Sequence, residues 1–313
     1  MSVSIIIPTY NRSEVLRKTL DAYAAQTGDH RILELLVVDD GSRDDTRSVV
    51  EQCTLAASFP IRYIYQENRG LAAARNHGIR EASGELLLFG DDDIIPTPGM
   101  VAKHTAWHQE YPDANLGLLG YVIWAPDVRP TPFMMWSGLY GPQFQFGTFK
   151  PGMELKYWHA YFCNTSVKAG FLAQNQMFNE IFQQYGWEDV EMSYRLYEEG
   201  FRMFYEPAAL GHHYKYETFA DTLRRVRKAN QSMAVFATTD AGRCYIRQVH
   251  STPRVAASRS AKEAAKGLLR PLRAPLMRLL RWLADTRIPL PSKVYSRVFF
   301  YYVNQRPQGL HAS

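Results

Sequence analysis

Apolar runs and amphipathic segments alternate along the first hundred residues. The runs SVSIIIPTY, LELLVVDDGS, IRYIYQE and GELLLFGDDD are mostly apolar, and all but the first end at acidic residues, which favours buried strands. The segments between them, at 13–27, 44–53 and 70–83, are expected to be helical, with Ser13 as the first N-cap. Strands that alternate with short helices are typical of βαβ units, so the pattern predicts a parallel sheet covered on both faces.

Beyond residue 115 the pattern is less regular. LGLLGYVIW is expected to form another strand, whereas residues 129–162 are rich in aromatic residues, proline and glycine, as in an irregular insertion. Helices are expected from about 190 to 199 and over 218–237. The predicted parts of the chain are residues 1–115, 116–240 and 241–313.

The composition favours a folded protein, and we expect it in the cytoplasm. Of 313 residues, 46% are hydrophobic, and 16 Phe, 19 Tyr and 6 Trp supply a core, which excludes a disordered protein. Three widely spaced cysteines form no CxxC pair, which argues against a disulfide framework or a zinc site. The N-terminus lacks the features of a signal peptide, and prolines and glycines interrupt the longest uncharged run, 130–149.

Charge is distributed unevenly along the chain. Residues 250–313 contain 12 Lys and Arg against 2 Asp and Glu, although the net charge of the whole chain is only +5. A basic tail on a mildly acidic body favours an anionic partner, such as a membrane surface, a nucleic acid or an acidic polymer.

Two acidic clusters end neighbouring predicted strands. Asp39 and Asp40 end one strand, and Asp91, Asp92 and Asp93 end another. In open α/β sheets this edge binds ligands, and clustered carboxylates there favour Mg²⁺ or Mn²⁺ with a diphosphate. For the first cluster a simple turn is an equally good interpretation. The chain has no GxxxxGK[ST] loop and no GxGxxG after the first strand, which disfavours NTPases and nicotinamide enzymes.

Several stretches resemble a known family. IIIPTYNR, VVDDGSRDDT, NRGLAAARNHGI and LLLFGDDDIIP follow one another as in the family 2 inverting glycosyltransferases of GT-A fold. CNTSVKAGF and FNEIFQQYGWEDVEMSYRL resemble the acceptor-side half of that family, so the resemblance covers about residues 3–215. It implies an α/β chain with a Rossmann-like, mostly parallel sheet flanked by helices, followed here by a helical, basic extension.

The resemblance implies a nucleotide site at the end of the first strand, at the Asp-Asp-Gly-Ser turn and near the third helix. The corresponding residues are Pro8, Thr9, Tyr10, Arg12, Asp39, Asp40, Arg75 and Asn76. Asp39 and Asp40 are alternatives for one contact, and a solvated helix face is the alternative role for Arg75.

The Asp-x-Asp motif of the family corresponds to Asp91 and Asp93, with Asp92 between them. The resemblance implies that Asp93 binds Mn²⁺ or Mg²⁺ directly and that Asp91 contacts the ribose or metal-bound water. Relatives often complete the metal site with a histidine after a later strand. The spacing favours His212 over His213, and a structural histidine is the alternative.

The sequence GWEDVE supplies the expected base. The resemblance implies that Asp189 deprotonates the acceptor hydroxyl and that Glu188 contacts acceptor or donor hydroxyls, although acids in a first helical turn also complement the helix dipole. Trp187 and Trp158 are expected to bind the acceptor, and core packing is an equal alternative for the aromatic insertion.

The tail at 258–283 alternates leucines with arginines, interrupted by Pro271 and Pro275. It is expected to lie on an anionic inner membrane leaflet, near a lipid-linked acceptor, as a peripheral membrane segment. Packing on the catalytic domain or in a homo-oligomer is the alternative. No nucleic acid partner is expected, because aromatic base-stacking motifs are missing.

The function expected from these observations is sugar transfer from a nucleotide sugar, most simply a UDP-sugar, to a glycan or lipid-linked acceptor. A sugar-phosphate nucleotidyltransferase shares the fold type but needs a glycine-rich, basic loop where this chain has PTYNRSE. A non-catalytic nucleotide-sugar-binding relative is the other alternative.

Overall fold

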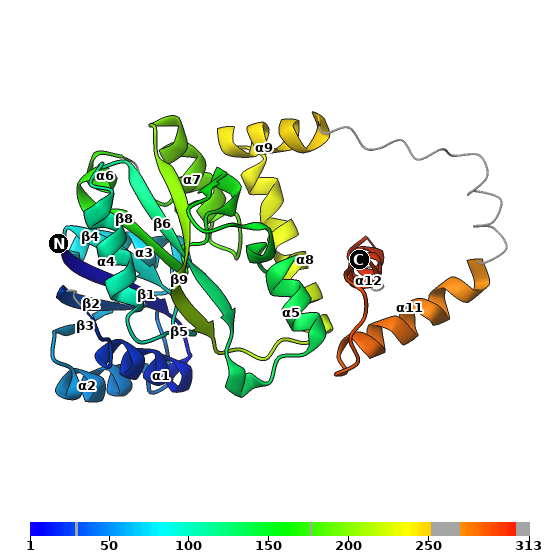
Figure 1. The fold of residues 1–313 in the computed structure, drawn as a ribbon, viewed down its shortest axis with the longest axis horizontal. Coiled ribbons are helices and arrows are strands. Elements are labelled where there is room, and N and C mark those ends of the chain that lie inside the picture. The colour runs from blue at the N-terminus through cyan, green and yellow to red at the C-terminus, as the bar shows by residue number, and fades with distance from the viewer. Residues whose placement is uncertain (29–30, 176, 252–269, 305–313) are drawn as a thin grey trace.

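The computed structural model describes residues 1–28, 31–175, 177–251 and 270–304 (Figure 1). Its strands are β1 (Ser2–Thr9), β2 (Arg31–Asp39), β3 (Ile61–Tyr65), β4 (Leu86–Gly90), β5 (Ile94–Pro96), β6 (Leu116–Trp124), β7 (Glu154–Leu155), β8 (Asn164–Lys168) and β9 (Arg202–His213). Its helices are α1 (Ser13–Ala24), α2 (Thr46–Ala56), α3 (Leu71–Glu81), α4 (Met100–Glu110), α5 (Pro132–Leu139), α6 (Ala169–Gln174), α7 (Glu188–Glu198), α8 (Phe219–Phe236), α9 (Asp240–Ser251), α11 (Arg270–Ala284) and α12 (Ser292–Val303). Among the described residues, no helix combines the length and the apolar character that crossing a bilayer requires.

The strands form a single mixed sheet in the order β3-β2-β1-β4-β8-β6-β9-β5, with β7 paired to β9. As predicted, β1 pairs in parallel with β2 and β4, and β2 with β3. β8 lies antiparallel between β4 and β6, whereas β6 and β9 are again parallel. The predicted α/β class and the mostly parallel sheet flanked by helices are confirmed.

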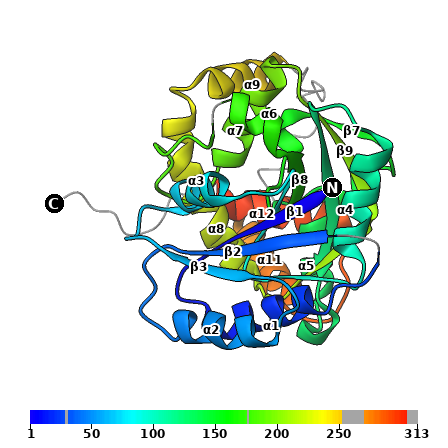
Figure 2. The ribbon, with the colours of Figure 1, turned by 90° about the vertical axis from the view of Figure 1, so that its left-hand side faces the viewer.

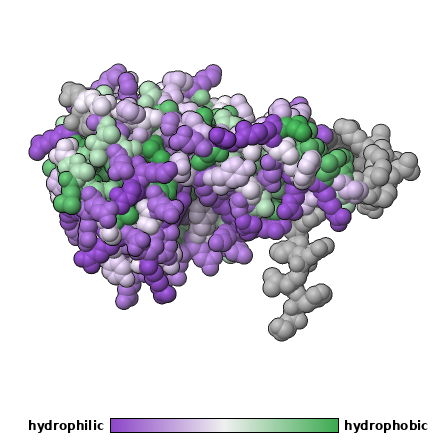
Figure 3. Space-filling model, turned by 90° about the horizontal axis from the view of Figure 1, so that it is seen from below, coloured by the Kyte–Doolittle hydropathy of each residue, from purple (hydrophilic) through white to green (hydrophobic). Residues whose placement is uncertain are grey.

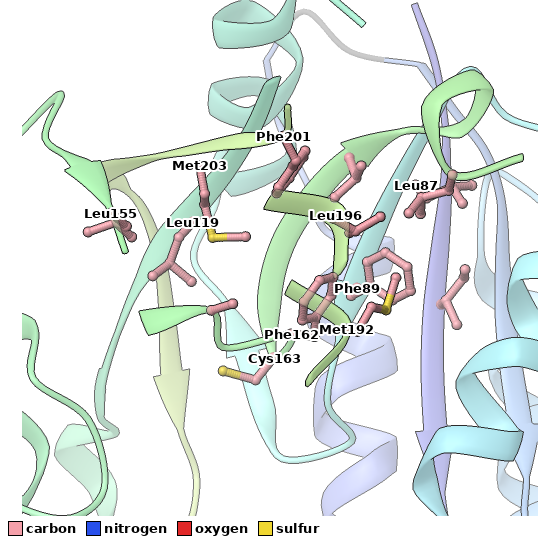
Figure 4. Packing of buried hydrophobic residues seen from close by; sticks show 14 of the residues in the cluster. Leu87, Phe89, Leu119, Leu155, Phe162, Cys163, Met192, Leu196, Phe201 and Met203 are labelled. Atoms are coloured by element: carbon pink, nitrogen blue, oxygen red, sulfur yellow. The ribbon is translucent and has the colours of Figure 1, made fainter. Parts of the chain in front are cut away.

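Helices bury both faces of the sheet, and successive side chains of a strand point to opposite faces. In β1, Ile6 joins one apolar cluster with α3, α6 and α7, whereas Ile5 and Ile7 join another with α1, α2 and α4. Figure 2 shows α1 and α2 on one side of the strands and α3 on the other. In the first cluster the rings of Phe89 and Phe162 meet edge to face at 5.2 Å (Figure 4). The unbroken apolar runs of the sequence are explained by this two-sided burial.

The first helix differs from the prediction at its cap. Arg12, not Ser13, occupies the N-cap position, and its side chain makes no capping hydrogen bond. Ser13 is the first helical residue, and its backbone N–H donates to Asp44 Oδ2 at 2.9 Å. A carboxylate from the turn before α2 thus replaces the predicted local cap.

The predicted irregular insertion contains regular structure. Residues 129–162 include α5 and the short 3₁₀ turns η2 (Phe146–Thr148) and η3 (Tyr157–His159). Thr131 caps α5 by accepting a hydrogen bond from the backbone N–H of Met134, and Trp124 Nε1 donates to the Met134 carbonyl at 2.6 Å. These contacts attach the insertion to the end of β6.

The last described helices pack on the body of the chain. α12 contacts α5, α8 and α11, beyond the sheet in Figure 1. The apolar cluster that joins them contains Phe133, Trp136, Phe219, Leu223, Ala284, Tyr295, Val298, Phe299 and Tyr302. Packing on the rest of the chain, one of the alternatives for the tail, is therefore found for one side of α11 and α12. Residues 258–269 of the predicted membrane segment lie outside the described residues.

Candidate active site

The three aspartates of GDDD follow β4 and lie where the carboxyl ends of parallel strands meet. Asp92 is buried and accepts hydrogen bonds from Thr9 Oγ1 at 2.8 Å and from Arg12 Nη1 at 2.7 Å. Asp93 accepts one from Arg12 Nη2 at 2.6 Å, and its Oδ2 lies 3.1 Å from His213 Nε2. Arg12 therefore bridges two carboxylates and offsets their repulsion.

The three carboxyl groups differ in acidity. Burial, with repulsion from Asp93, raises the pKa of Asp92 to about 8, although Arg12 acts in the opposite direction. Burial alone would raise the pKa of Asp93 too, but His213 and Arg12 hold it well below its ordinary value. Burial also raises the pKa of Asp91, to about 6. Asp93 is thus ionised near neutral pH.

The histidine at Asp93 is His213 rather than His212. Both belong to β9, in which successive side chains point to opposite faces. His213 stacks on the ring of Trp124 at 4.8 Å and lines the pocket beside the aspartates, and His212 does not. The structure thus brings His213, and not the predicted His212, to Asp93, because β9 continues through both histidines and the strand register decides which one faces the site.

Arg75 connects the aspartates to the start of α7. Its guanidinium donates from Nη1 to Asp189 Oδ1 at 2.6 Å and from Nη2 to Asp91 Oδ1 at 3.1 Å. Nη2 also donates to the carbonyl of Phe162 at 3.0 Å. Only 2% of Arg75 is exposed, so the alternative of a solvated helix face is wrong. The guanidinium of Arg75 thus pairs with one carboxylate that follows β4 and with another at the start of α7.

Two acidic residues begin α7. Asp189 Oδ2 accepts a hydrogen bond from the backbone N–H of Phe162 at 3.1 Å, which fixes the carboxylate while part of it stays exposed. Glu188 is more deeply buried, and burial together with Asp189 raises its pKa to about 7. Glu188 Oε2 has no hydrogen-bond partner among the residues that the structure describes. Asp189 is oriented and accessible, and Glu188 has an oxygen that a ligand could satisfy.

Two pockets adjoin these side chains. The strand-end pocket, of about 400 Å³, is lined among others by Pro8, Thr9, Tyr10, Arg12, Asp40, Asp91, Asp92, Asp93 and His213. The aromatic pocket, of about 360 Å³, is lined among others by Arg75, Trp158, Tyr161, Trp187, Glu188, Asp189 and Tyr245. Seven residues line both pockets: Leu71, Asp91, Gln143, Phe144, Cys163, Tyr185 and Arg225. Molecules bound in the two pockets would therefore adjoin at this shared wall, which includes Asp91.

Of the alternatives Asp39 and Asp40, the structure brings Asp40 to the strand-end pocket. Asp39 is turned into the loop, where it accepts hydrogen bonds from the backbone N–H of Ser42 at 2.8 Å and from the Tyr63 hydroxyl at 2.7 Å. Asp40 also orders a loop, because its carboxylate accepts from the backbone N–H of Gly70 at 2.9 Å.

Asn76 lies outside both pockets. Its Nδ2 donates to the Phe178 carbonyl and to Glu180 Oε1, and its Oδ1 accepts from the Phe178 N–H, each at 2.9 Å. These bonds use its amide to hold the neighbouring loop, so the structure does not bring Asn76 to the predicted nucleotide site.

The two predicted acceptor tryptophans both line the aromatic pocket. Trp187 precedes α7 with φ of 76°, a conformation that non-glycine residues rarely adopt. Its Nε1 donates to the Ala229 carbonyl at 2.8 Å, and one ring face stacks on Phe236 at 4.6 Å. These contacts hold the strained backbone beside Glu188 and Asp189 and leave Trp187 with one face already covered. Trp158 is half-buried at the same pocket.

Arg225 of α8 is a site residue that the sequence does not reveal. It lines both pockets, and its Nε donates to the buried Glu217 at 3.0 Å. The segment TLRRVRKAN contains four basic residues in helical order, and no local pattern distinguishes the one that faces inward.

Asp93 and His213 are the candidate ligands for a cation that a bound diphosphate would help to hold. Among the described residues, no three His, Cys, Asp or Glu side chains are grouped as a complete metal site. Asp93 and His213 nevertheless place a carboxylate oxygen and an imidazole nitrogen 3.1 Å apart on the wall of the strand-end pocket. This pair suits Mn²⁺ better than Mg²⁺, which prefers oxygen ligands, and a diphosphate and water would supply the remaining ligands.

Comparison with curated proteins places the chain among glycosyltransferases. Validoxylamine A glucosyltransferase of Streptomyces hygroscopicus subsp. jinggangensis (strain 5008) is 32% identical over 234 residues, which cover 64% of this chain and 52% of that protein. A second validoxylamine A glucosyltransferase, from subsp. limoneus, is also 32% identical, with 49% of its length covered. The chain thus spans about half the length of these relatives.

Solved structures share the fold at low sequence identity. Staphylococcus aureus TarS 1-349, in complex with UDP-GlcNAc, superposes with a TM-score of 0.57 at 18% identity, over 96% of this chain and 91% of that one. The mannosyltransferase PcManGT from Pyrobaculum calidifontis, in complex with GDP-Man and Mn²⁺, gives 0.55 at 17% identity, over 96% and 87%. Residues 4–173 match the family model described as Glycosyl transferase family 2. The family and the GT-A fold implied by the motifs are confirmed, and the chain belongs to glycosyl transferase family 2.

Proposed function

We propose that this chain is a metal-dependent, inverting glycosyltransferase. It would move a sugar from a nucleoside-diphosphate donor, a UDP-sugar in the first instance, to a hydroxyl of a glycan or lipid-linked acceptor in cell-surface polysaccharide or glycolipid synthesis. The observation that carries the proposal is Arg75, which joins Asp91 in the strand-end pocket to Asp189 in the aromatic pocket. A donor site and an acceptor site with a general base would adjoin in this way.

The strand-end pocket suits the donor. Pro8, Thr9, Tyr10 and Asp40 line the part that would hold the nucleoside. Asp93 and His213 would hold the cation, which would neutralise negative charge on the departing diphosphate. The similar solved structures contain UDP-GlcNAc in one case and GDP-Man in another, so the base of the donor is left to measurement.

The aromatic pocket suits the acceptor, because aromatic faces pack well on sugar rings. In an inverting transfer the acceptor oxygen forms a bond to the anomeric carbon while the bond from that carbon to the diphosphate oxygen breaks. Asp189 would take the proton of the acceptor hydroxyl, and the nucleoside diphosphate would leave with the bonding electrons. The Phe162 N–H and Arg75 orient Asp189 for this role.

Calorimetric titration of UDP and GDP, each with and without Mn²⁺, tests this proposal. We expect one diphosphate to bind tightly only when Mn²⁺ is present. Asp93→Ala should abolish this metal-dependent binding, whereas Asp189→Asn should retain it and lose about a hundredfold or more of sugar transfer.

Failure of both diphosphates to bind the wild-type chain would contradict the donor assignment. Transfer at the wild-type rate by Asp189→Asn would instead refute only the assignment of the base. A circular dichroism spectrum of each variant controls for unfolding.

A further inference from the structure

Helix α11 has two apolar sides, and the structure covers one of them. Met277, Leu280 and Ala284 face the cluster shared with α12, α5 and α8. Leu276, Leu279 and Trp282 follow one another at intervals of three residues, so they lie along one side of the helix. They are 49%, 52% and 65% exposed, and we call them the α11 stripe.

Basic residues accompany the α11 stripe. Arg278 and Arg281 are exposed on the same helix, and Arg287, Lys293 and Arg297 are exposed between it and the end of α12. The only acidic residue described in this region, 270–304, is Asp285, which accepts a hydrogen bond from the backbone N–H of Phe219. Hydrophobic and hydrophilic residues lie side by side at this end of the molecule (Figure 3). Exposed leucines and tryptophan beside arginines are the composition of helices that lie in a membrane interface.

We propose that the α11 stripe docks on the surface of an anionic lipid bilayer. Leucine and tryptophan side chains would enter the interface between headgroups and acyl chains, and the arginines would pair with lipid phosphates. Charge decides between this partner and a second copy of the chain. The described residues 270–304 carry seven Lys and Arg against one Asp, so two such surfaces would repel each other, whereas anionic lipid attracts them.

Docking at α11 would hold the candidate site near the bilayer. α11 packs on α12, and α12 packs on α5 and α8 through an apolar cluster. α8 also carries Arg225, which lines both pockets. The bilayer would therefore present acceptors with a lipid anchor to a site attached to it through packed helices. Because vesicle binding is measured without substrates, this proposal can fail or succeed independently of the proposed transferase activity.

Co-sedimentation of the full chain with vesicles tests the proposal. One set of vesicles contains phosphatidylcholine alone, and the other contains phosphatidylcholine mixed with phosphatidylglycerol. We expect binding to the second set that weakens as salt is raised. The double variant Leu279→Ala/Trp282→Ala should lower the partition coefficient at least about tenfold, because two apolar side chains no longer enter the interface.

Leu55→Ala is the matched control, since Leu55 is 89% exposed on α2 and should leave vesicle binding unchanged. Equal thermal midpoints would show that the double variant is folded. Absence of binding to anionic vesicles, or binding that the double variant does not weaken, would overturn the proposal. A dimer in light scattering that the double variant dissociates would overturn it too, by making the stripe a subunit interface.

Discussion

Glu188 is a buried acid beside a second acid, Asp189, and its pKa is raised. Its ionisation at alkaline pH therefore lowers the free energy of unfolding. Its pKa in the folded chain is about 7, against an ordinary value of 4.5. When the pKa of an acid is higher in the folded than in the unfolded state, the protonated acid stabilises the fold. This stabilisation is fully present at a pH below the unfolded pKa and is lost as the pH rises through the folded pKa. A residue kept at such a cost beside the candidate base is typical of a functional site.

We therefore expect Glu188→Gln to unfold with a higher free energy than the wild type at pH 8, by on the order of 2 kcal/mol. The difference should disappear near pH 4, where the glutamate is protonated in both states. Urea unfolding followed by circular dichroism over this pH range measures it. Glu198→Gln, an exposed acid on the same helix, is the control, and an equal pH dependence in both variants would contradict the assigned burial effect.

His212 and His213 provide a matched pair for testing the proposed metal site. Because His213 lies 3.1 Å from Asp93 and His212 does not line the pocket, His213→Ala should weaken Mn²⁺-dependent nucleotide binding about tenfold to a hundredfold. His212→Ala should leave it within error of the wild type. Titration of the nucleotide with and without Mn²⁺ measures both, and the reverse order of effects would restore the original prediction.

Residues in the candidate site differ in how far the sequence predicts them. Asp91 and Asp93 follow an apolar run directly, and the ends of parallel strands must meet, so local pattern is sufficient. The choice of His213 depends on the register of β9, which its pairing with β5 and β6 decides. The place of Arg225 in the site depends on which side of α8 faces the pockets. The sequence does not distinguish Arg225 from the three other basic residues beside it.

At the scale of elements, β8 is one of the strands that the pattern does not predict. All five residues of NTSVK are buried although only one is apolar. Ser166 Oγ lies 2.8 Å from His104 Nδ1 and 2.9 Å from His108 Nε2, and Asn164 Oδ1 lies 2.9 Å from His104 Nε2. Asn164 and Ser166 are thus paired with histidines of α4, about sixty residues earlier, and no local pattern in the sequence predicts that pairing.

The hydrogen bonds of this network fix its protons. Asn164 Nδ2 donates to the Ala209 carbonyl at 2.9 Å, so its Oδ1 accepts from His104. Ser166 then donates to His104 Nδ1 and accepts from His108 Nε2. Burial lowers the pKa of His104 to about 4 and that of His108 to about 3, so both imidazoles are neutral near pH 7. An uncharged polar network therefore anchors the strand that joins the two halves of the sheet.

By contrast, the βαβ half follows the sequence closely. The apolar runs of β1, β2 and β4 lie between helices on both faces, and propensity, burial and chain order favour the same structure there. The insertion before β8 shows no regular hydrophobic periodicity, so the sequence predicts it as irregular. The short helix α5 and the 3₁₀ turns are ordered by packing instead.

At the scale of the whole molecule, α12 ties the end of the described chain to its body. Phe299 is 2% exposed in the cluster with α5 and α8, whereas its neighbour Phe300 is 60% exposed. Phe299→Ala should lower the free energy of unfolding by about 3 to 5 kcal/mol, and Phe300→Ala should change it by less than about 0.5 kcal/mol. Chemical denaturation of both variants measures this difference.

A single transition for both variants would show that α12 unfolds together with the sheet. If Phe299→Ala instead produced an early, separate transition without affecting the main one, the C-terminal helices would be an independent unit, contrary to the packing seen here.

Arg75 couples the two pockets energetically, because Asp91 and Asp189 share its guanidinium. A variant of Asp91 leaves its guanidinium to Asp189, and a variant of Asp189 leaves it to Asp91. Losses measured for the two aspartates separately should therefore not sum to the loss in the double variant, as holds for groups that share a partner. Under the proposed function, a substitution of Asp91 that weakens donor binding would leave the whole Arg75 charge to Asp189 and would so change the acceptor side of the site as well.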